Sequence, residues 1–340
     1  MAKFDAYMNT YQVAWRRTHA LPEGEGWQNG KQRPWILPKQ HWQYGLWLGI
    51  RRGSAYALPD YLQRNRIQKH QGVHNLKSSW MLCANLYFPF GATEDSRNLL
   101  AGFLREYVSP EIQSVDSIEL EYAEPTDSPL HPSSLLGEQG GSRGTGQTSP
   151  DVAFHINNGQ GLVLVENKFV EHSFYTCSAR RRNGSDARPG NPDPSRCNET
   201  SALPDNFETL CHQTVWGRRY WEHLAPVIDQ EVVASLPCCP AAKAGYQLFR
   251  QHALAEGIAA SGKYNQVISC VALDARNETV RRCLRTTGIP KVRQWGELFH
   301  GQAQFAVFTH QQWVAWVHTH GGGQWTDWLH YVQERYEYNV

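Results

Sequence analysis

Residues 150–170 read PDVAFHINNGQGLVLVENKFV and predict two antiparallel strands, 151–156 and 161–170, joined by a tight turn. Asn-Gly at 158–159 is the strongest short signal for a two-residue hairpin turn, because both central residues of such a turn need a positive φ. The run 162–165 is apolar at every position, which is typical of a strand covered on both faces. This stretch therefore predicts a hairpin whose second strand lies inside a sheet.

The register of this hairpin brings charged residues together at its open end. With Asn158 and Gly159 at the centre of the turn, Asp151 lies opposite Glu166, and Lys168 shares the face of Glu166 because side chains alternate along a strand. Adjacent carboxylates repel unless a cation lies between them, and hard oxygen ligands favour Mg²⁺ or Mn²⁺. The neighbouring ammonium can orient an attacking water or stabilise charge on a phosphate. A salt-bridge cluster at a sheet edge is the alternative, but the opposed Asp and the preceding Pro favour catalysis.

The flanking sequence mixes helical and strand patterns. Apolar spacing predicts helices at 74–88, 96–108 and 207–228, strands at 114–124, 264–274 and 304–310, and two Trp-rich helices within 311–336. We expect an α/β fold, with a central mixed β-sheet flanked by helices. The expected organisation is a basic, Trp-rich N-terminal accessory region (1–73), a core (74–275), and a C-terminal strand with Trp-rich helices (276–340). Gly, Pro and Ser predict loop insertions in the core at 125–149, including a flexible linker at 137–146, and at 177–206.

Pro150-Asp151, followed by Glu166-Asn167-Lys168 at the end of the next strand, resembles the motif of the PD-(D/E)XK nuclease superfamily. The resemblance covers residues 75–275, whose expected elements are similar to the αβββαβ core of those enzymes. Within the superfamily the chain is most similar to a restriction-endonuclease-like group, the PGN_0703-like proteins. This closer similarity lies in SSWMLCANLYFPF before the sheet and KFVEHSFYTC after the Lys. The resemblance implies metal-dependent phosphodiester hydrolysis by water, with Mg²⁺ or Mn²⁺ as cofactor.

The resemblance also implies residue roles. Asp151 and Glu166 look like the two metal ligands, and Lys168 looks like the base that orients the water. A further acidic ligand from the preceding strand is common in the superfamily. Glu119 and Glu121 are the candidates, expected on one face of strand 114–124, where they could equally be exposed edge charges.

Several polar residues after the motif could support this site. Gln213 lies on the expected helix 207–228, but the Q-x-x-x-Y pattern of some superfamily members is broken here, because position 217 is Gly. The basic side chains are candidates for contacts with nucleic-acid phosphates. They are Arg180, Arg181, Arg182, Arg218 and Arg219.

Charge is unevenly distributed along a chain whose net charge is only +1. Residues 1–80 hold 12 Lys or Arg against 4 Asp or Glu, and residues 81–150 hold 3 against 10. Five Trp residues are interleaved with the basic block, at 15, 27, 35, 42 and 47. Such a block suits a surface that binds a polyanion and stacks on bases. Packing of the Trp residues on the rest of the protein is the equally weighted alternative.

Composition excludes several classes of protein. The 40 aromatic residues exclude disorder over most of the 340-residue chain, and no apolar run is long enough to span a membrane. The start of the chain lacks the apolar stretch of a secretory signal, so we expect a cytoplasmic, reducing compartment. The C-terminal His residues, including His310, show no ligand spacing and are expected at the surface or an interface.

The eight Cys residues are interpreted as core residues or metal ligands rather than disulfides. Cys177, Cys197 and Cys211 follow the Glu-x-Lys strand within a polar, Arg-rich stretch, and Cys238 and Cys239 lie further on. Four thiolates, or three with a His, would satisfy zinc or an iron–sulfur cluster. The spacing is no compact metal motif, so unpaired Cys without metal remain the alternative.

These observations predict a metal-dependent endonuclease acting on nucleic acid, with a possible role in defence against foreign DNA. DNA is preferred to RNA on the resemblance alone. A homodimer is plausible because cutting both strands of a duplex usually takes two sites. The main alternative is a non-catalytic nucleic-acid-binding or assembly protein that keeps the fold. A hydrolase of small phosphate esters is a weaker reading, since residues 137–146 lack the Lys-Ser/Thr of a phosphate-binding loop.

Overall fold

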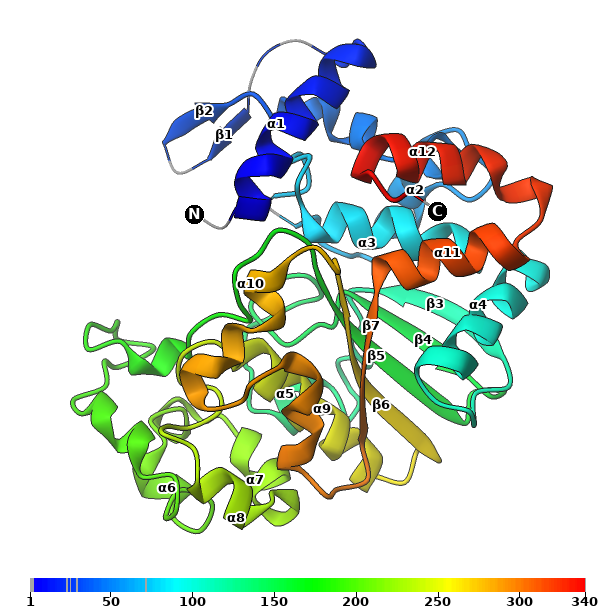
Figure 1. The fold of residues 1–340 in the computed structure, drawn as a ribbon. Helices are drawn as coiled ribbons and strands as arrows, with labels where there is room; N and C mark the ends of the chain where they lie inside the picture. The colour runs from blue at the N-terminus through cyan, green and yellow to red at the C-terminus, as the bar shows by residue number, and fades with distance from the viewer. Residues whose placement is uncertain (1–2, 23, 25, 29, 71, 340) are drawn as a thin grey trace.

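The computed structural model describes residues 3–22, 24, 26–28, 30–70 and 72–339. A five-stranded mixed sheet lies at its centre, in the order β3-β4-β5-β6-β7 (Figure 1). The strands β3, β4 and β5 are antiparallel neighbours, whereas β5, β6 and β7 run parallel. Their bounds are Val115–Leu120, Val152–Ile156, Gly161–Lys168, Gln266–Leu273 and Gln304–Thr309. The predicted α/β fold with a mixed sheet flanked by helices is confirmed.

The hairpin β4–β5 has the register that the sequence predicts. Val152 pairs with Val165, and Ile156 pairs with Gly161. Asn158 and Gly159 have φ values of 57° and 75°, and the Gln160 amide donates to the Asn157 carbonyl at 3.2 Å. The turn therefore needs left-handed backbone at both central positions, which Asn and Gly tolerate best. Every residue of β5 is buried, as expected for a central strand.

One face of the sheet is covered by α3 (Ser79–Tyr87), α4 (Glu94–Tyr107) and α11 (His310–His320), and α12 (Thr326–Tyr336) packs on α3 and α11 on the side away from the sheet (Figure 1). Capping residues define where these helices begin: the Ser78 side chain accepts from the Met81 amide, and Thr93 forms a capping box with Ser96. The Trp313 indole of α11 donates to the Leu86 carbonyl of α3 at 2.9 Å. Residues from both ends of the chain thus share one core with the sheet.

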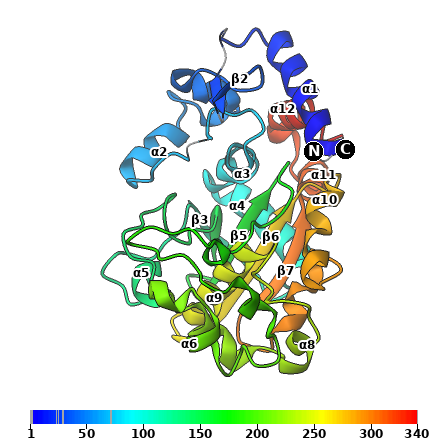
Figure 2. The ribbon, with the colours of Figure 1, turned by 90° about the vertical axis from the view of Figure 1, so that its left-hand side faces the viewer.

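The other face is covered by α9 (Tyr246–Ala260) and α7 (Tyr220–Leu224), which pack on alternate residues such as Leu162 and Leu164. The short helix α5 (Pro132–Leu135) lies against α9 so closely that a Cβ on Gly257 would come within 2.8 Å of Leu135. Figure 2 shows α5, α6 (Phe207–Leu210) and α8 (Gln230–Ala234) at the end of the molecule opposite α1 and α2.

The remaining elements are short or peripheral. The helices are α1 (Lys3–Thr18), α2 (Leu58–Arg64) and α10 (Glu278–Arg281), and a small antiparallel sheet pairs β1 (Gly26–Gln28) with β2 (Lys31–Arg33). Turns of 3-10 helix lie at Lys39–Gly45, Leu48–Ile50, Phe88–Gly91, Ser178–Arg180, Pro194–Asn198, Thr214–Trp216, Ala225–Val227, Cys283–Thr287, Val292–Leu298 and Gly323–Trp325. In the described residues, no helix combines the length and apolar character needed to cross a membrane.

Three sequence-based predictions differ from the structure. The N-terminal region begins with a 16-residue helix, α1, whereas its Pro, Gly, Trp and Arg content, with little periodicity, predicts irregular or short elements over residues 1–70. The expected helix 207–228 is interrupted, because Gly217 adopts a left-handed φ of 69° between short helical segments. The helix that connects β5 to β6 is instead α9. Finally, residues 137–146 are not a solvated linker, because buried Glu138 accepts hydrogen bonds from Tyr220 and Arg250.

Candidate active site at the end of the central strands

The hairpin β4–β5 places Asp151 beside Glu166 at one end of the sheet. Asp151 directly precedes β4, and its Oδ2 accepts a hydrogen bond from the Asn167 amide at 2.7 Å. Glu166 and Lys168 lie on β5 and are only 7 % and 2 % exposed. Desolvation, followed by the charge of Glu166, raises the pKa of Asp151 well above its usual value. The two carboxylates therefore repel each other, as their predicted register implies.

Glu121 completes this acidic group from the end of β3. Its amide donates to the Asp151 carbonyl at 3.0 Å, and its side chain is 4 % exposed. Desolvation, and then the charges of Asp151 and Glu166, raise its pKa well above the usual value. The structure thus brings three of the predicted site carboxylates together.

Glu119 does not join this group. We expected Glu119 and Glu121 on one face of a strand, but β3 ends at Leu120 and Glu121 adopts a left-handed φ of 50°. Glu119 instead pairs with Arg143 at 2.7 Å and with His155 at 3.1 Å. The prediction that Glu119 and Glu121 share one face of the strand is wrong, because the strand ends one residue before Glu121.

Lys168 is held as a cation by its surroundings. Its Nζ lies 2.7 Å from Glu166 Oε1, and it lies 5.5 and 5.6 Å from the ring centroids of Phe174 and Tyr175. Burial alone would lower the pKa of Lys168, but the charges of Glu166 and Glu171 outweigh it and raise the pKa. Lys168 is therefore suited to stabilising negative charge and orienting water, and in this arrangement it is protonated.

Gln247 of α9 is a site residue that the sequence-based reasoning missed. Its Oε1 accepts from Lys168 Nζ at 2.9 Å, and its Nε2 donates to Glu166 Oε1 at 2.7 Å. Gln213, the candidate for a supporting Gln, lies elsewhere: its Nε2 donates to Cys177 Sγ and to the Tyr246 hydroxyl. Recognising 246–260 as the helix after β5 would have pointed to Gln247.

His70 comes from the N-terminal region to the same site. The charges of Glu171, Lys168 and Glu166 all act on its ring. Glu171 itself accepts from the Phe169 amide at 2.7 Å, which turns the chain back over the strand end. No sequence pattern pointed to His70, because it is brought to the site only by the tertiary fold.

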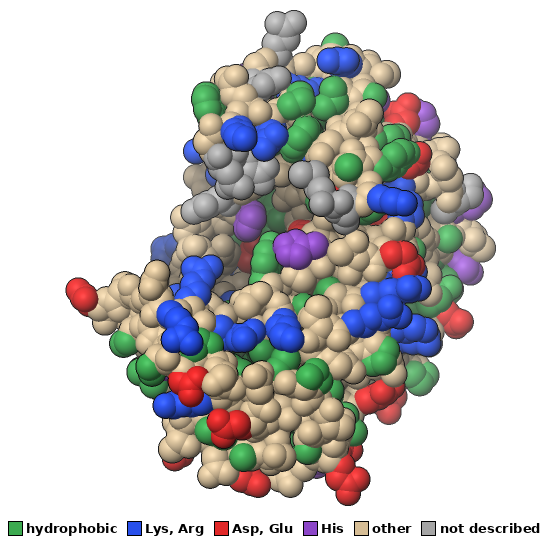
Figure 3. Space-filling view, turned by 60° about the vertical axis from the view of Figure 1, so that its left-hand side comes forward, with side chains coloured by type: hydrophobic (Ala, Val, Ile, Leu, Met, Phe, Trp, Pro, Cys, Tyr) green, Lys and Arg blue, Asp and Glu red, His purple; other side chains and the backbone are tan. Residues whose placement is uncertain are grey.

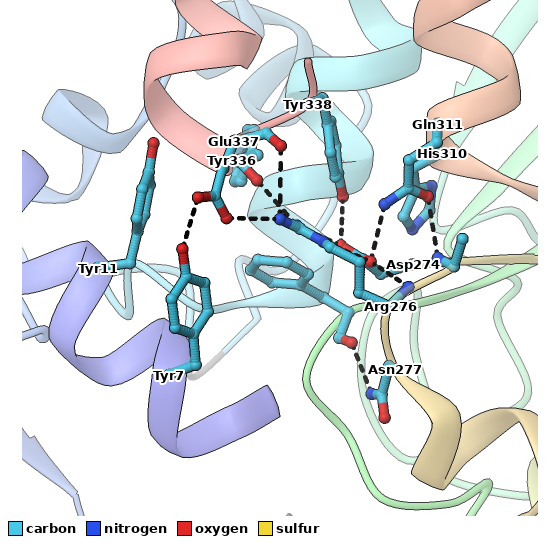
Figure 4. Close-up of polar contacts among 12 residues, drawn as sticks. Tyr7, Tyr11, Asp274, Arg276, Asn277, His310, Gln311, Tyr336, Glu337 and Tyr338 are labelled. Carbon is cyan, nitrogen blue, oxygen red and sulfur yellow. Dashed lines mark hydrogen bonds and ion pairs between the residues drawn. The ribbon is translucent and has the colours of Figure 1, made fainter. Parts of the chain in front are cut away.

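The end of β5 is held in place by a polar network from the C-terminal part of the chain. His310 Nε2 lies 3.1 Å from the Lys168 carbonyl, and the Asp274 amide donates to the same oxygen. Asp274 in turn accepts from Arg276, Gln311 and Tyr338 (Figure 4). Burial alone would raise the pKa of Asp274, but the hydrogen bonds and charge of Arg276 lower it. His310 is fully buried, so the prediction that it lies at the surface is wrong.

The donor set at this site suits a hard divalent cation. In the part of the chain that the structure describes, no three His, Cys, Asp or Glu side chains stand at the spacing of a formed metal-ion site. Asp151 and Glu166 each use one carboxylate oxygen in the hydrogen bonds described above. Besides desolvation, the charges of Asp151 and Glu166 raise the pKa of Glu121, and the charge of Glu166 raises the pKa of Asp151. A divalent cation between these carboxylates would relieve their repulsion.

The predicted phosphate-binding Arg residues have different surroundings. Arg181 and Arg182 are exposed, and Arg180 is half-buried. Arg218 is buried and donates to the Gly137 carbonyl, while Arg219 pairs with Glu222 at 2.7 Å. Figure 3 shows a hollow on one face of the molecule, with His side chains on its rim and a row of Lys and Arg side chains below it.

The Trp residues of the basic N-terminal block mostly pack inward. Trp15 and Trp42 are buried, and Trp35 and Trp47 are half-buried. Trp27 is 63 % exposed. Packing on the protein, the alternative to base stacking, is therefore what the structure shows for Trp15 and Trp42.

The predicted Cys ligands also come together, away from the carboxylates. Cys177, Cys197 and Cys211 line one small cavity, and the fourth Cys there is Cys239. Cys238, its neighbour in sequence, does not line this cavity.

Comparison with known proteins gives one match. A family model, REase-ARP, described as "Restriction Endonuclease associating with ARP", matches residues 9–337. No curated protein and no solved structure gives a significant match.

Proposed function

Because the chain belongs to the family of restriction endonucleases associating with ARP, we propose that it is a metal-dependent endonuclease that hydrolyses phosphodiester bonds in DNA. The match extends over nearly the whole chain and confirms the restriction-endonuclease-like resemblance. The observation that carries the proposal is the buried group of Asp151, Glu166 and Glu121 beside Lys168, at the end of the central strands. Burying like charges together costs free energy, so such a group is better explained by catalysis than by stability.

The residues of this group have separate roles in the proposed reaction. Asp151, Glu166 and Glu121 would hold Mg²⁺ or Mn²⁺. The bound ion would polarise the phosphate and lower the pKa of a water ligand. The Lys168 ammonium orients the attacking water and stabilises charge that develops on the phosphate. Gln247 fixes Lys168 relative to Glu166 through its two hydrogen bonds and is a positioning residue.

The substrate surface and the partners are part of the proposal. Exposed Arg181 and Arg182 are candidates for contacts with the phosphates of the substrate, which the charge and geometry of arginine suit. The family's description names ARP as an associate, so an association with ARP is proposed for this chain. Defence against foreign DNA, and a homodimer that cuts both strands, complete the proposal.

A cleavage assay tests this function. Purified protein is incubated with plasmid, single-stranded DNA and RNA in Mg²⁺, Mn²⁺ or EDTA. We expect metal-dependent cleavage of DNA that falls about 100-fold or more in Lys168→Ala, because a charge-stabilising group is lost. Lys263→Ala is the matched control, since Lys263 also pairs with a Glu, at 2.6 Å, but does so away from the site.

The outcomes separate the candidates. Equal cleavage by Lys168→Ala and the wild type would show that the site is elsewhere. Binding of DNA without cleavage, unchanged in Asp151→Asn, would favour the non-catalytic binding protein instead. Addition of ARP to a protein that is inactive alone tests whether association is needed.

A further inference from the structure

Four Cys side chains from separate segments surround one enclosed cavity of about 20 Å³. Cys177 precedes a 3-10 turn, Cys197 lies within Pro194–Asn198, Cys211 follows α6, and Cys239 lies in the loop before α9. All four are free thiols. They lie on the α7–α9 side of the sheet and do not belong to the carboxylate site. Four segments converging on one point with the same soft ligand is the arrangement that thiophilic metals require.

The four thiols interact with one another. Burial is the main factor that raises their pKa values, to about 11 for Cys197 and about 12 for Cys211. The second contribution is mutual: Cys177 acts on Cys197 and Cys211, and all three act on Cys239. Cys238 does not line this cavity, although its charge also acts on Cys197. The lining of the cavity thus selects Cys239 from the adjacent pair.

The surroundings offer compensation for negative charge. Gln213 Nε2 donates to Cys177 Sγ at 3.2 Å. The charge of Arg180 acts on Cys177 and Cys197, and its Nε is buried without a hydrogen-bond partner among the described residues. Four neutral thiols do not need a guanidinium beside them. Thiolates bound to a metal are stabilised by a nearby positive charge, because their ligation leaves net negative charge.

We propose that Cys177, Cys197, Cys211 and Cys239 together ligate one thiophilic metal centre, either a zinc ion or an iron–sulfur cluster. For a single zinc ion the thiolates would approach by side-chain rotation, because the described residues show no formed three-ligand ion site. Both kinds of centre use four thiolates, and binding releases their protons to solvent.

The position of this centre gives it a structural role. Between β5 and α9 the chain runs for 77 residues, from 169 to 245, with only short helical segments. Such a stretch consists mostly of loops, and a metal would fix three of these loops to the loop before α9. Gln213 also donates to the Tyr246 hydroxyl at 2.9 Å, next to Gln247. The centre is therefore expected to stabilise the insertion and the start of α9.

Metal analysis of the full chain, purified without oxygen or chelators, tests the inference independently of nuclease activity. Iron, sulfide and zinc are measured per chain, with an absorption spectrum and metal-edge spectroscopy. Brown protein with iron and sulfide identifies a cluster, and colourless protein with one sulfur-coordinated zinc identifies a zinc site. Wild-type protein without either, in which all four thiols react under native conditions, would overturn the proposal.

Adjacent Cys residues provide a matched pair of variants. Cys239→Ser is expected to reduce the metal content about tenfold or more, which is the loss typical of a perturbed metal site. The same variant is expected to have a lower Tm. Cys238→Ser changes a Cys that is just as buried but does not line the cavity, so the metal should be retained. Equal loss in both variants would contradict the assignment of ligands. If Cys239→Ser is insoluble, the sulfur coordination number of the wild-type metal carries the test.

Discussion

Replacing His310 with Gln should make the protein less sensitive to mild acid. His310 is buried, and burial lowers its pKa from 6.5 to about 4. Its ring is held neutral by its two partners: Nε2 donates to the Lys168 carbonyl, which can only accept, and Nδ1 accepts from the Tyr87 hydroxyl at 3.1 Å. Protonation would put a second donor against that hydroxyl within the core. Asp274, Glu171 and Arg276 are the charged groups that act on the ring.

The magnitude follows from proton binding. Between pH 6.5 and about 4 the unfolded chain binds a proton at this position and the folded chain does not, so stability falls as pH falls through this window. From pH 7 to pH 5 the loss is about 2 kcal/mol for a His whose pKa drops from 6.5 to about 4. His252, whose pKa burial lowers to about 3, adds a loss of the same sign.

Urea unfolding at pH 7, 6 and 5 measures this effect. His310→Gln keeps a donor and an acceptor but does not titrate, so its free energy of unfolding should fall by about 2 kcal/mol less than the wild type's over this range. His330→Gln is the control, because His330 is largely exposed and should leave the slope unchanged. A slope in His310→Gln equal to that of the wild type would refute the reasoning.

Three further outcomes are expected. Gln247→Leu should lower the rate of DNA cleavage about 10- to 100-fold, whereas its Tm should change little. Initial rates and a thermal melting curve measure the two effects. An unchanged rate would show that Gln247 has no role in the site. Asp274→Asn should lower the free energy of unfolding by about 1–3 kcal/mol, because Arg276 loses its charged partner. The control is Glu278→Gln, which removes an exposed ion pair and should change the free energy of unfolding by less than about 0.5 kcal/mol. Glu138→Ala should expose residues 125–149 to limited proteolysis, because Arg250 loses its carboxylate, and resistance equal to the wild type would argue that other contacts hold that segment.

The sequence predicts the central hairpin well because its information is local. Asn158 and Gly159 set the turn, the turn sets the register, and the register puts Asp151 beside Glu166. Strands β3 and β6 flank the hairpin β4–β5 in the sheet, and all four of these strands show clear apolar patterns. The same logic fails for Glu119, because strand alternation cannot reveal that Glu121 leaves the strand with a positive φ.

The predictions that fail depend on distant contacts. Helix α9 is buried around most of its circumference, so its sequence shows no single apolar stripe. Nε2 of its buried Gln251 donates to the Leu164 and Cys270 carbonyls of the sheet, contacts that no local pattern reveals. Gln247 and His70 reach the site across 79 and 98 residues from Lys168, and the choice of Cys239 over Cys238 depends on the path of one loop.

The C-terminal residues that clamp Asp274 have a consequence for the order of biosynthesis. Tyr336, Glu337 and Tyr338 contact the Asp274–Arg276 pair, and Tyr7 of α1 bonds to Glu337 (Figure 4). A chain still on the ribosome can form the β4–β5 hairpin long before these residues emerge. The strand end that carries Lys168 acquires this part of its support only after residues 336–338 are made. Folding of the site is thereby coupled to the synthesis of residues more than 160 positions further along the chain, so a product truncated before residue 336 would carry the motif without its rigid setting.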